Sequence, residues 1–171
     1  RRFKSVMDII KDIRNKAKAL QKVIVFPESG DPRVLRAVEF LSREKLCRSL
    51  LIGCQDKIQR VAAKERIELD IDSEATILVC HPDREEIVKG LYERCGNRGI
   101  PVRESRQLFS ANPLIFGAAL VDKGYADGIV AGSVGTTGDV VKAAIRCIGT
   151  KKEASVVSGI FLLIMPDGKV F

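Results

Sequence analysis

Short apolar runs alternate along this chain with longer stretches in which apolar residues recur every three or four positions. Continuous runs of four or five apolar residues are typical of strands buried on both faces of a parallel sheet, whereas the wider spacing is typical of amphipathic helices. Runs of the first kind predict strands at 23–26, 49–52, 76–80 and 128–131. Their alternation with helices predicts an α/β fold, a parallel sheet with helices on both faces.

Capping signals mark several of the intervening helices. Asp31 and Asn112 each precede a proline, which is the arrangement of an N-cap and a first helical position. Gly124 is placed to end the helix after Asn112 in a left-handed conformation. Further helices are predicted over 1–20, over 58–64, after Pro82, and from the loop after the fourth strand to about Ile148. The first of these is basic and amphipathic, and packing on its own domain is favoured over membrane binding.

The pattern changes after residue 150. Residues 156–165 form a long apolar run that predicts a strand, and Pro166-Asp167-Gly168 predicts a tight turn. A return strand that stops at Phe171 leaves an open ladder edge, so we interpret the chain as truncated. We therefore expect an N-terminal α/β domain over 1–150 and the beginning of a second α/β domain over 151–171.

Composition narrows the classes of function. The chain is 46% hydrophobic and 30% charged, and no apolar run reaches the roughly 20 residues that span a bilayer. The net charge of +7 favours anionic ligands, or simply describes a lysine-rich surface. With seven Phe, two Tyr, no Trp and no basic–aromatic ladder, the sequence favours a phosphorylated small molecule over nucleic acid.

The five cysteines show no CxxC spacing, which disfavours a disulfide framework or a zinc site and suggests reduced thiols in the cytoplasm. His81, the one histidine, follows the third predicted strand. No cluster of acidic or cysteine ligands surrounds it in the sequence, so no metal is expected.

The strongest chemical signal is the glycine- and threonine-rich loop over 132–139, which follows a predicted strand and opens a helix. Glycines allow a ligand close to the backbone, and free N–H groups at a helix start suit an anion. A simple strand-to-helix turn capped by Thr or Asp explains the loop equally well. The segment 26–33 lies at the same predicted edge, but turn chemistry and a helix cap account for it better than a site does.

Three ordered groups of residues resemble the phosphate acetyltransferase (phosphotransacetylase) family, with phosphate butyryltransferase as close kin. They are Val25-Phe26-Pro27-Glu28 with Asp31 and 33–37, 112–118 with 124–128, and 130–132 with Thr136-Thr137 and Asp139-Val140. The resemblance implies an isocitrate/isopropylmalate dehydrogenase-like fold, two α/β domains around a cleft, and usually a homodimer. Family chains are about twice as long as this one, and their catalytic aspartate belongs to the C-terminal portion, so this piece alone is expected to be inactive and its catalytic base is unknown.

The implied reaction is reversible acetyl transfer between acetyl-CoA and inorganic phosphate, giving acetyl phosphate and CoA. CoA is then a substrate, and no tightly bound cofactor is expected. Residues that match the family's substrate loop and phosphate site are Gly132, Ser133, Thr136, Thr137 and Lys142. Lys142 stands where the family usually has an arginine, so it offers a point charge in place of a two-pronged fork. Arg94 is assigned to CoA by its place beside the family's coenzyme-contacting arginine.

Two other functions are compatible with the same fold. A non-catalytic domain would bind an acyl-CoA and regulate, as in domains fused to some malic enzymes. A dehydrogenase is disfavoured because no nucleotide fingerprint is present.

Overall fold

A computed structural model describes the chain in several stretches: 6–70, 76–79, 112–151, 153, 156–163 and 165. Within them the elements run α1 (Val6–Leu20), β1 (Val23–Phe26), α2 (Pro32–Arg43), β2 (Arg48–Ile52), α3 (Gln55–Glu65), β3 (Thr76–Val79), α6 (Pro113–Asp122), β4 (Gly128–Ile129) and α7 (Thr137–Cys147). The sequence places all four strands and these helices within a few residues of their observed bounds.

The four strands form one sheet in the order β3-β2-β1-β4, and every neighbouring pair is parallel. Val25 of β1 is the centre of the register, with Leu50 of β2 on one side and Ile129 of β4 on the other. The chain therefore builds outward from β1 to β3 and then returns to the far side of β1. This reversal makes the gap between the carboxyl ends of β1 and β4 a topological switch point.

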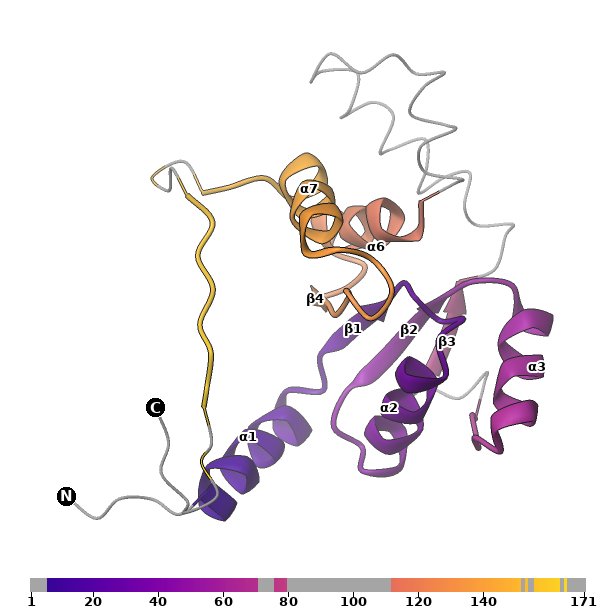
Figure 1. Cartoon of the computed structure of the whole chain (residues 1–171). Helices are drawn as coiled ribbons and strands as arrows, with labels where there is room; N and C mark the ends of the chain where they lie inside the picture. Colours follow the sequence, from indigo (N-terminus) through magenta and orange to yellow (C-terminus); the bar gives the residue numbers. More distant parts are fainter. Residues whose placement is uncertain are drawn as a thin grey trace.

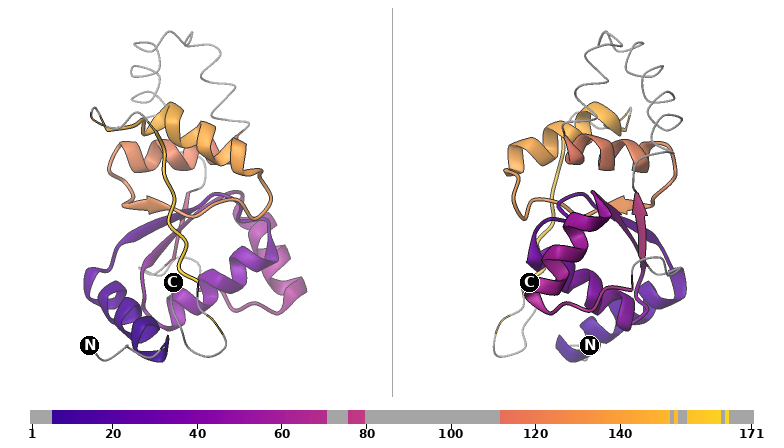
Figure 2. Two further views of the ribbon diagram at one scale, coloured as in Figure 1. Left: turned by 60° about the vertical axis from the view of Figure 1, so that its left-hand side comes forward. Right: turned by 90° about the vertical axis from the view of Figure 1, so that its right-hand side faces the viewer.

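Helices cover both faces of the sheet, as predicted (Figure 1). On one face, α2 and α3 bury Leu35, Val38 and Ile58 against Phe26 and Leu51. The opposite face is covered by α6, whose Phe116 and Leu120 pack on the strands, and α7 lies on α6 (Figure 2). Because α6 is buried between the sheet on one side and α7 on the other, it is apolar almost all round.

A glycine sets the distance between α6 and the sheet. A Cβ on Gly117 would lie 2.9 Å from Ile129 Cδ1 and 3.1 Å from Val25 Cγ1. A side chain there would force these packed side chains to shift, so Gly117 allows α6 to lie directly on β1 and β4.

The capping predictions are confirmed. Asp31 accepts from the N–H of Arg33, and Asn112 accepts from the first N–H groups of α6. Gly124 has φ +78° just after α6. The fourth strand is shorter than expected, because the chain turns away from the sheet after Val130 donates its N–H to the Val25 carbonyl.

Two apolar segments lie outside the packed layers. On α1, Ile13 and Leu20 are 53% and 61% exposed, while Arg14 stacks over Phe40 of α2. The long strand predicted over 156–165 is wrong for the part that the structure describes, which has no strand. A strand needs a hydrogen-bonded neighbour, and none of the four sheet strands pairs with this segment.

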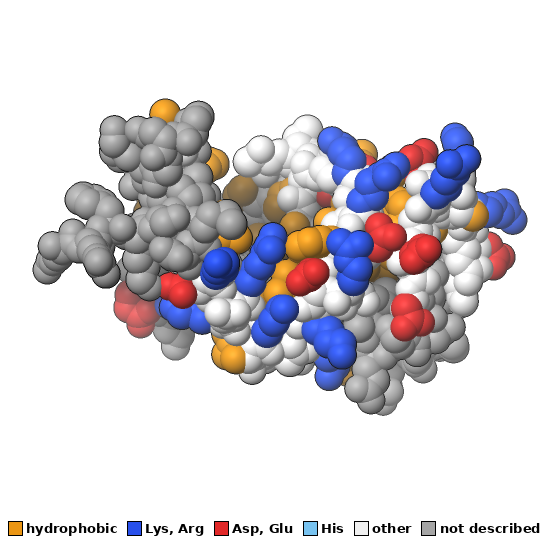
Figure 3. All heavy atoms as spheres, turned by 90° about the horizontal axis from the view of Figure 1, so that it is seen from below, with side chains coloured by type: hydrophobic (Ala, Val, Ile, Leu, Met, Phe, Trp, Pro, Cys, Tyr) orange, Lys and Arg blue, Asp and Glu red, His pale blue; other side chains and the backbone are white. Residues whose placement is uncertain are grey.

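The described helices include none long and apolar enough to cross a membrane. Lysine and arginine side chains are scattered over the face seen in Figure 3, with acidic groups between them. That distribution matches the simple interpretation of the net charge as a solvated basic surface.

Candidate functional site at the carboxyl edge of the sheet

The switch point brings two loops together. The first follows β1, carries Glu28 and leads into α2, whose first turn carries Arg33; the second follows β4 and runs from Val130 to Thr136. Both lie at the sheet edge where ligands bind in open α/β folds. The sequence predicts that these two loops share one edge of the sheet, but it does not predict the contact between them.

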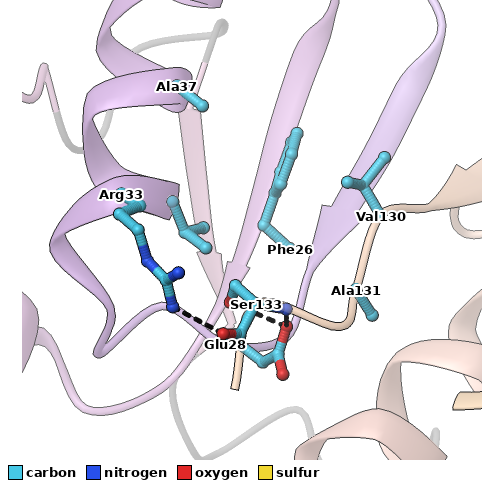
Figure 4. Close-up of a pocket in the computed structure, with 8 residues that line it drawn as sticks. Phe26, Glu28, Arg33, Ala37, Val130, Ala131 and Ser133 are labelled. Carbon is cyan, nitrogen blue, oxygen red and sulfur yellow. Dashed lines mark hydrogen bonds between the residues drawn. The ribbon is translucent and has the colours of Figure 1, made fainter. Parts of the chain in front are cut away.

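That contact is between the Glu28 carboxylate and the backbone of the second loop (Figure 4). Its Oε2 accepts from the N–H of Gly132 at 2.7 Å, and from the N–H and hydroxyl of Ser133 at 2.8 and 2.9 Å. Its Oε1 accepts from the N–H of Val134 at 2.9 Å and of Gly135 at 2.6 Å. Successive N–H groups that converge in this way form an anion-binding nest, and here the anion comes from the chain itself.

Two glycines make the nest geometrically feasible. Gly132 has φ +101°, a conformation that L side chains rarely adopt. A Cβ on Gly135 would lie 3.3 Å from Glu28 Oε1 and 3.1 Å from Leu114 Cδ1. As expected, the glycines allow an anion to come close to the backbone, but that anion is the carboxylate of Glu28 and not a ligand.

The nest stabilises the charged form of Glu28. Partial burial raises the pKa of this carboxyl, but the hydrogen bonds from the N–H groups of Gly135, Ser133 and Val134 and from the Ser133 hydroxyl lower it by more. The pKa consequently falls from 4.5 to about 2. Glu28 is therefore an anion throughout the neutral range.

Arg33 holds the outer side of the same loop. Its Nη2 donates to the Ser133 carbonyl at 2.5 Å and to Asp31 Oδ2 at 2.6 Å. The hydrogen bond from Arg33 is the largest cause of the lowered pKa of Asp31. Glu28 and Arg33, five residues apart, thus hold the N–H and C=O sides of one peptide loop.

The second loop ends in a capping box. The Thr136 hydroxyl donates to Asp139 Oδ2 at 2.6 Å and accepts from the Asp139 N–H at 3.2 Å. The hydrogen bond from the Thr136 hydroxyl is the largest cause of the lowered pKa of Asp139. The positive charge of Lys142 also lowers this pKa. Thr137, the first residue of α7, and Lys142 are both exposed. Thr136 is thus a helix cap, while Thr137 and Lys142 face solvent on the first turns of α7.

A pocket of about 200 Å³ adjoins the nest. It is lined by Phe26, Glu28, Arg33, Val34, Ala37, Val130, Ala131 and Ser133. One side of the pocket is apolar, and the other carries the Glu28–Ser133–Arg33 contacts.

The structure thus brings Gly132 and Ser133 into one cluster, with Thr136 and Thr137 on the adjoining turn. Sequence reasoning noted the segment around Glu28 but interpreted it as turn chemistry. A usable signal was present, namely a carboxylate two residues after a buried strand at the predicted ligand edge.

Two other candidates, Arg94 and His81, lie outside the described residues. Among the residues that are described, no group of three or more His, Cys, Asp or Glu side chains could hold a metal ion.

Together the fold and site define a class of protein: an α/β protein with a parallel sheet and an anion-holding loop at its switch point. A family described as phosphate acetyl/butaryl transferase matches residues 8–171. The chain belongs to this family, as the resemblance predicted.

Relatives agree with this assignment. The chain is 32% identical over 162 residues to a phosphate acetyltransferase of Thermoanaerobacterium thermosaccharolyticum, covering 94% of this chain and 48% of that protein. The Staphylococcus aureus phosphate acetyltransferase is 34% identical over 161 residues, with the same coverage. The chain spans about half the length of these relatives.

Solved structures show the same similarity. An EutD phosphotransacetylase from Staphylococcus aureus superposes with a TM-score of 0.82 at 29% identity, over 96% of this chain and 49% of that one. A phosphotransacetylase from Streptococcus pyogenes gives 0.82 at 28% identity, with equal coverage. The α/β prediction is confirmed.

Proposed function

We propose that this chain provides part of the active site of a phosphate acetyltransferase, which transfers an acetyl group reversibly between acetyl-CoA and inorganic phosphate. Family membership and the names of the relatives support the reaction. The observation that carries the proposal is the position of the glycine- and threonine-rich loop over 132–139 at the switch point, where an α/β sheet binds its ligands.

The phosphate and oxyanion contacts would come from this loop and the start of α7. Thr137 would supply a hydroxyl group and Lys142 positive charge. Gly132, Ser133 and Thr136, whose N–H or hydroxyl groups already donate to Glu28 or Asp139, would shape the loop around the substrate. Donors aimed at the carbonyl oxygen and the phosphate stabilise the charge that develops as the CoA thiolate attacks acetyl phosphate. Arg94 is proposed as a CoA contact on the basis of the resemblance.

The wider setting also stays a proposal. The sheet over 1–150 would be the first domain and 151–171 the start of a second, with the cleft between them and the isocitrate/isopropylmalate dehydrogenase-like arrangement that the resemblance implies. A homodimer in the cytoplasm, with no resident cofactor, fits a metabolic acyltransferase. The catalytic base would lie outside this chain.

Butyryl transfer is the second candidate, because the matched family is described by both acyl groups. Acetyl-CoA and butyryl-CoA, each assayed with phosphate, separate the two by their kcat/KM values. The more efficient substrate identifies the acyl group.

The test uses the complete polypeptide that the gene encodes, assayed for thioester formation from acetyl phosphate and CoA. Lys142→Ala should raise the KM for acetyl phosphate roughly ten- to hundredfold, since it removes a charge-assisted contact worth about 1.5–3 kcal/mol. Lys57→Ala on α3, an exposed lysine on the opposite face of the sheet, is the matched control and should leave the KM unchanged.

No turnover with either acyl group, together with CoA binding detected by calorimetry, would reject the transferase. The acyl-CoA-binding regulatory domain would then be the better description.

A further inference from the structure

The nest at the switch point is already full. Each of the four consecutive N–H groups from Gly132 to Gly135 donates to Glu28. A donor that already has a short, charge-assisted partner has little left to give to a second anion. A substrate phosphate that used these four groups would first have to expel Glu28.

Expulsion would be costly. It breaks five hydrogen bonds to one carboxylate and moves a charged group whose pKa is about 2. The nearest guanidinium, that of Arg33, is already held by Asp31 and by the Ser133 carbonyl. Arg33 is therefore not a free cation that could receive the displaced carboxylate.

The loop is also shaped by Glu28. Four amides can point to one spot only if the peptides between them curve inward, and the left-handed Gly132 permits that curve. The curve leads directly into Thr136 and Thr137 at the start of α7. Whatever fixes the nest therefore fixes where α7 begins and where its exposed groups point.

We propose that Glu28 is a positioning residue, a built-in anion that holds the loop in its substrate-ready shape, so that the substrate phosphate binds on the adjoining turn at Thr137 and Lys142 and leaves the nest to Glu28. The proposal rests on the proposed function for the identity of the substrate. The occupied nest itself is independent of that function.

Chemical rescue tests the proposal in the complete polypeptide. Glu28→Ala vacates the nest, and kcat should fall on the order of 100-fold because the reacting groups lose their alignment, with a change in KM for acetyl phosphate below about threefold. Formate, a free carboxylate of the right size, should restore kcat at least tenfold and raise the Tm of this variant. Glu28→Gln is the matched control, since its side chain still fills the space and leaves no room for formate, so formate should not rescue it.

Two outcomes would contradict the positioning role of Glu28. If Glu28→Ala binds phosphate more tightly and formate competes with phosphate, the nest is the phosphate site and Glu28 is its competitor. Rescue of Tm without rescue of kcat would likewise overturn a positioning role in catalysis.

A second measurement protects the test against variants that fail to fold. In the unaltered protein, the carboxylate carbon resonance of Glu28 should keep its position and its acid titration when phosphate saturates the site. A shift in either on adding phosphate would show displacement and overturn the proposal.

The experiments distinguish a failure of the proposed transferase function from a failure of the proposed role of Glu28. An unaltered polypeptide without turnover rejects the transferase, and calorimetry then tests the nest alone. Formate that binds the Ala variant but not the unaltered chain supports the built-in anion. Equal binding, or no binding to either, contradicts it.

Discussion

The two loops at the carboxyl edge of the sheet contribute opposite kinds of chemistry. The loop after β1 and the first turn of α2 offer side chains, the Glu28 carboxylate and the Arg33 guanidinium, on a backbone that Asp31 fixes as a helix cap. The loop after β4 offers its backbone, the N–H groups of 132–135. In the first loop side-chain identity matters most, whereas in the second the conformation of the glycines does.

This difference shows how one sheet edge divides its tasks. An anion stabilises the curve of a backbone nest, because it offsets the repulsion between N–H dipoles that point to one spot. Hydrogen-bond donors stabilise the charged form of a carboxylate and so lower its pKa, as they do for Glu28. Each loop therefore supplies what the other lacks, and changes in either should destabilise both.

The largest effect is expected from acid, because protonation weakens all of the Glu28 hydrogen bonds together. The folded pKa of about 2 lies below the ordinary value of 4.5, so the unfolded chain binds more protons between these values. The contribution of Glu28 is fully present above about pH 4.5 and is lost as the pH falls towards 2.

Glu28→Gln isolates this contribution from the other carboxylates with lowered pKa values, Asp31, Asp127 and Asp139. The difference in free energy of unfolding between unaltered protein and variant, measured by urea denaturation, should shrink from pH 5 towards the acid limit of folding. A difference that is constant with pH would contradict the role of the nest.

The next largest effect separates the glycines of the two loops. Gly132→Ala should cost about 1–2 kcal/mol, because alanine is strained at φ +101°. Gly30→Ala in the first loop is the matched control, since an added Cβ there meets nothing within 4 Å and φ is not in the left-handed region. Thermal unfolding of both variants measures the difference, and equal losses would show that the backbone of the second loop is no more demanding than that of the first.

The smallest effect concerns the junction of the second loop with α7. Thr136→Ala removes the capping box and should cost about 1 kcal/mol, as is usual for loss of an N-cap. Thr137→Ala, one residue later and exposed, should leave the free energy of unfolding nearly unchanged. If both substitutions cost the same, the capping hydrogen bonds contribute little to the junction.

Much of the fold was readable from local pattern. Apolar runs placed the strands, and Asp31 and Asn112 marked the starts of α2 and α6. These signals are readable because strand burial and helix capping depend on residues close together in the sequence. The strand predicted over 156–165 was wrong for a related reason: an apolar run shows that a segment could form a strand, but not that a second strand is there to pair with it.

By itself, the sequence determined the α/β class, the order of the described elements and the edge of the sheet at which the two loops meet. The tertiary structure decided what occupies the loop over 132–135. Glu28 lies 104 to 107 residues from its partners there, and no periodicity or motif spans that distance. The contact exists because β4 returns to pair with β1, and the packing of α6 on these strands, with α7 on α6, supports that pairing.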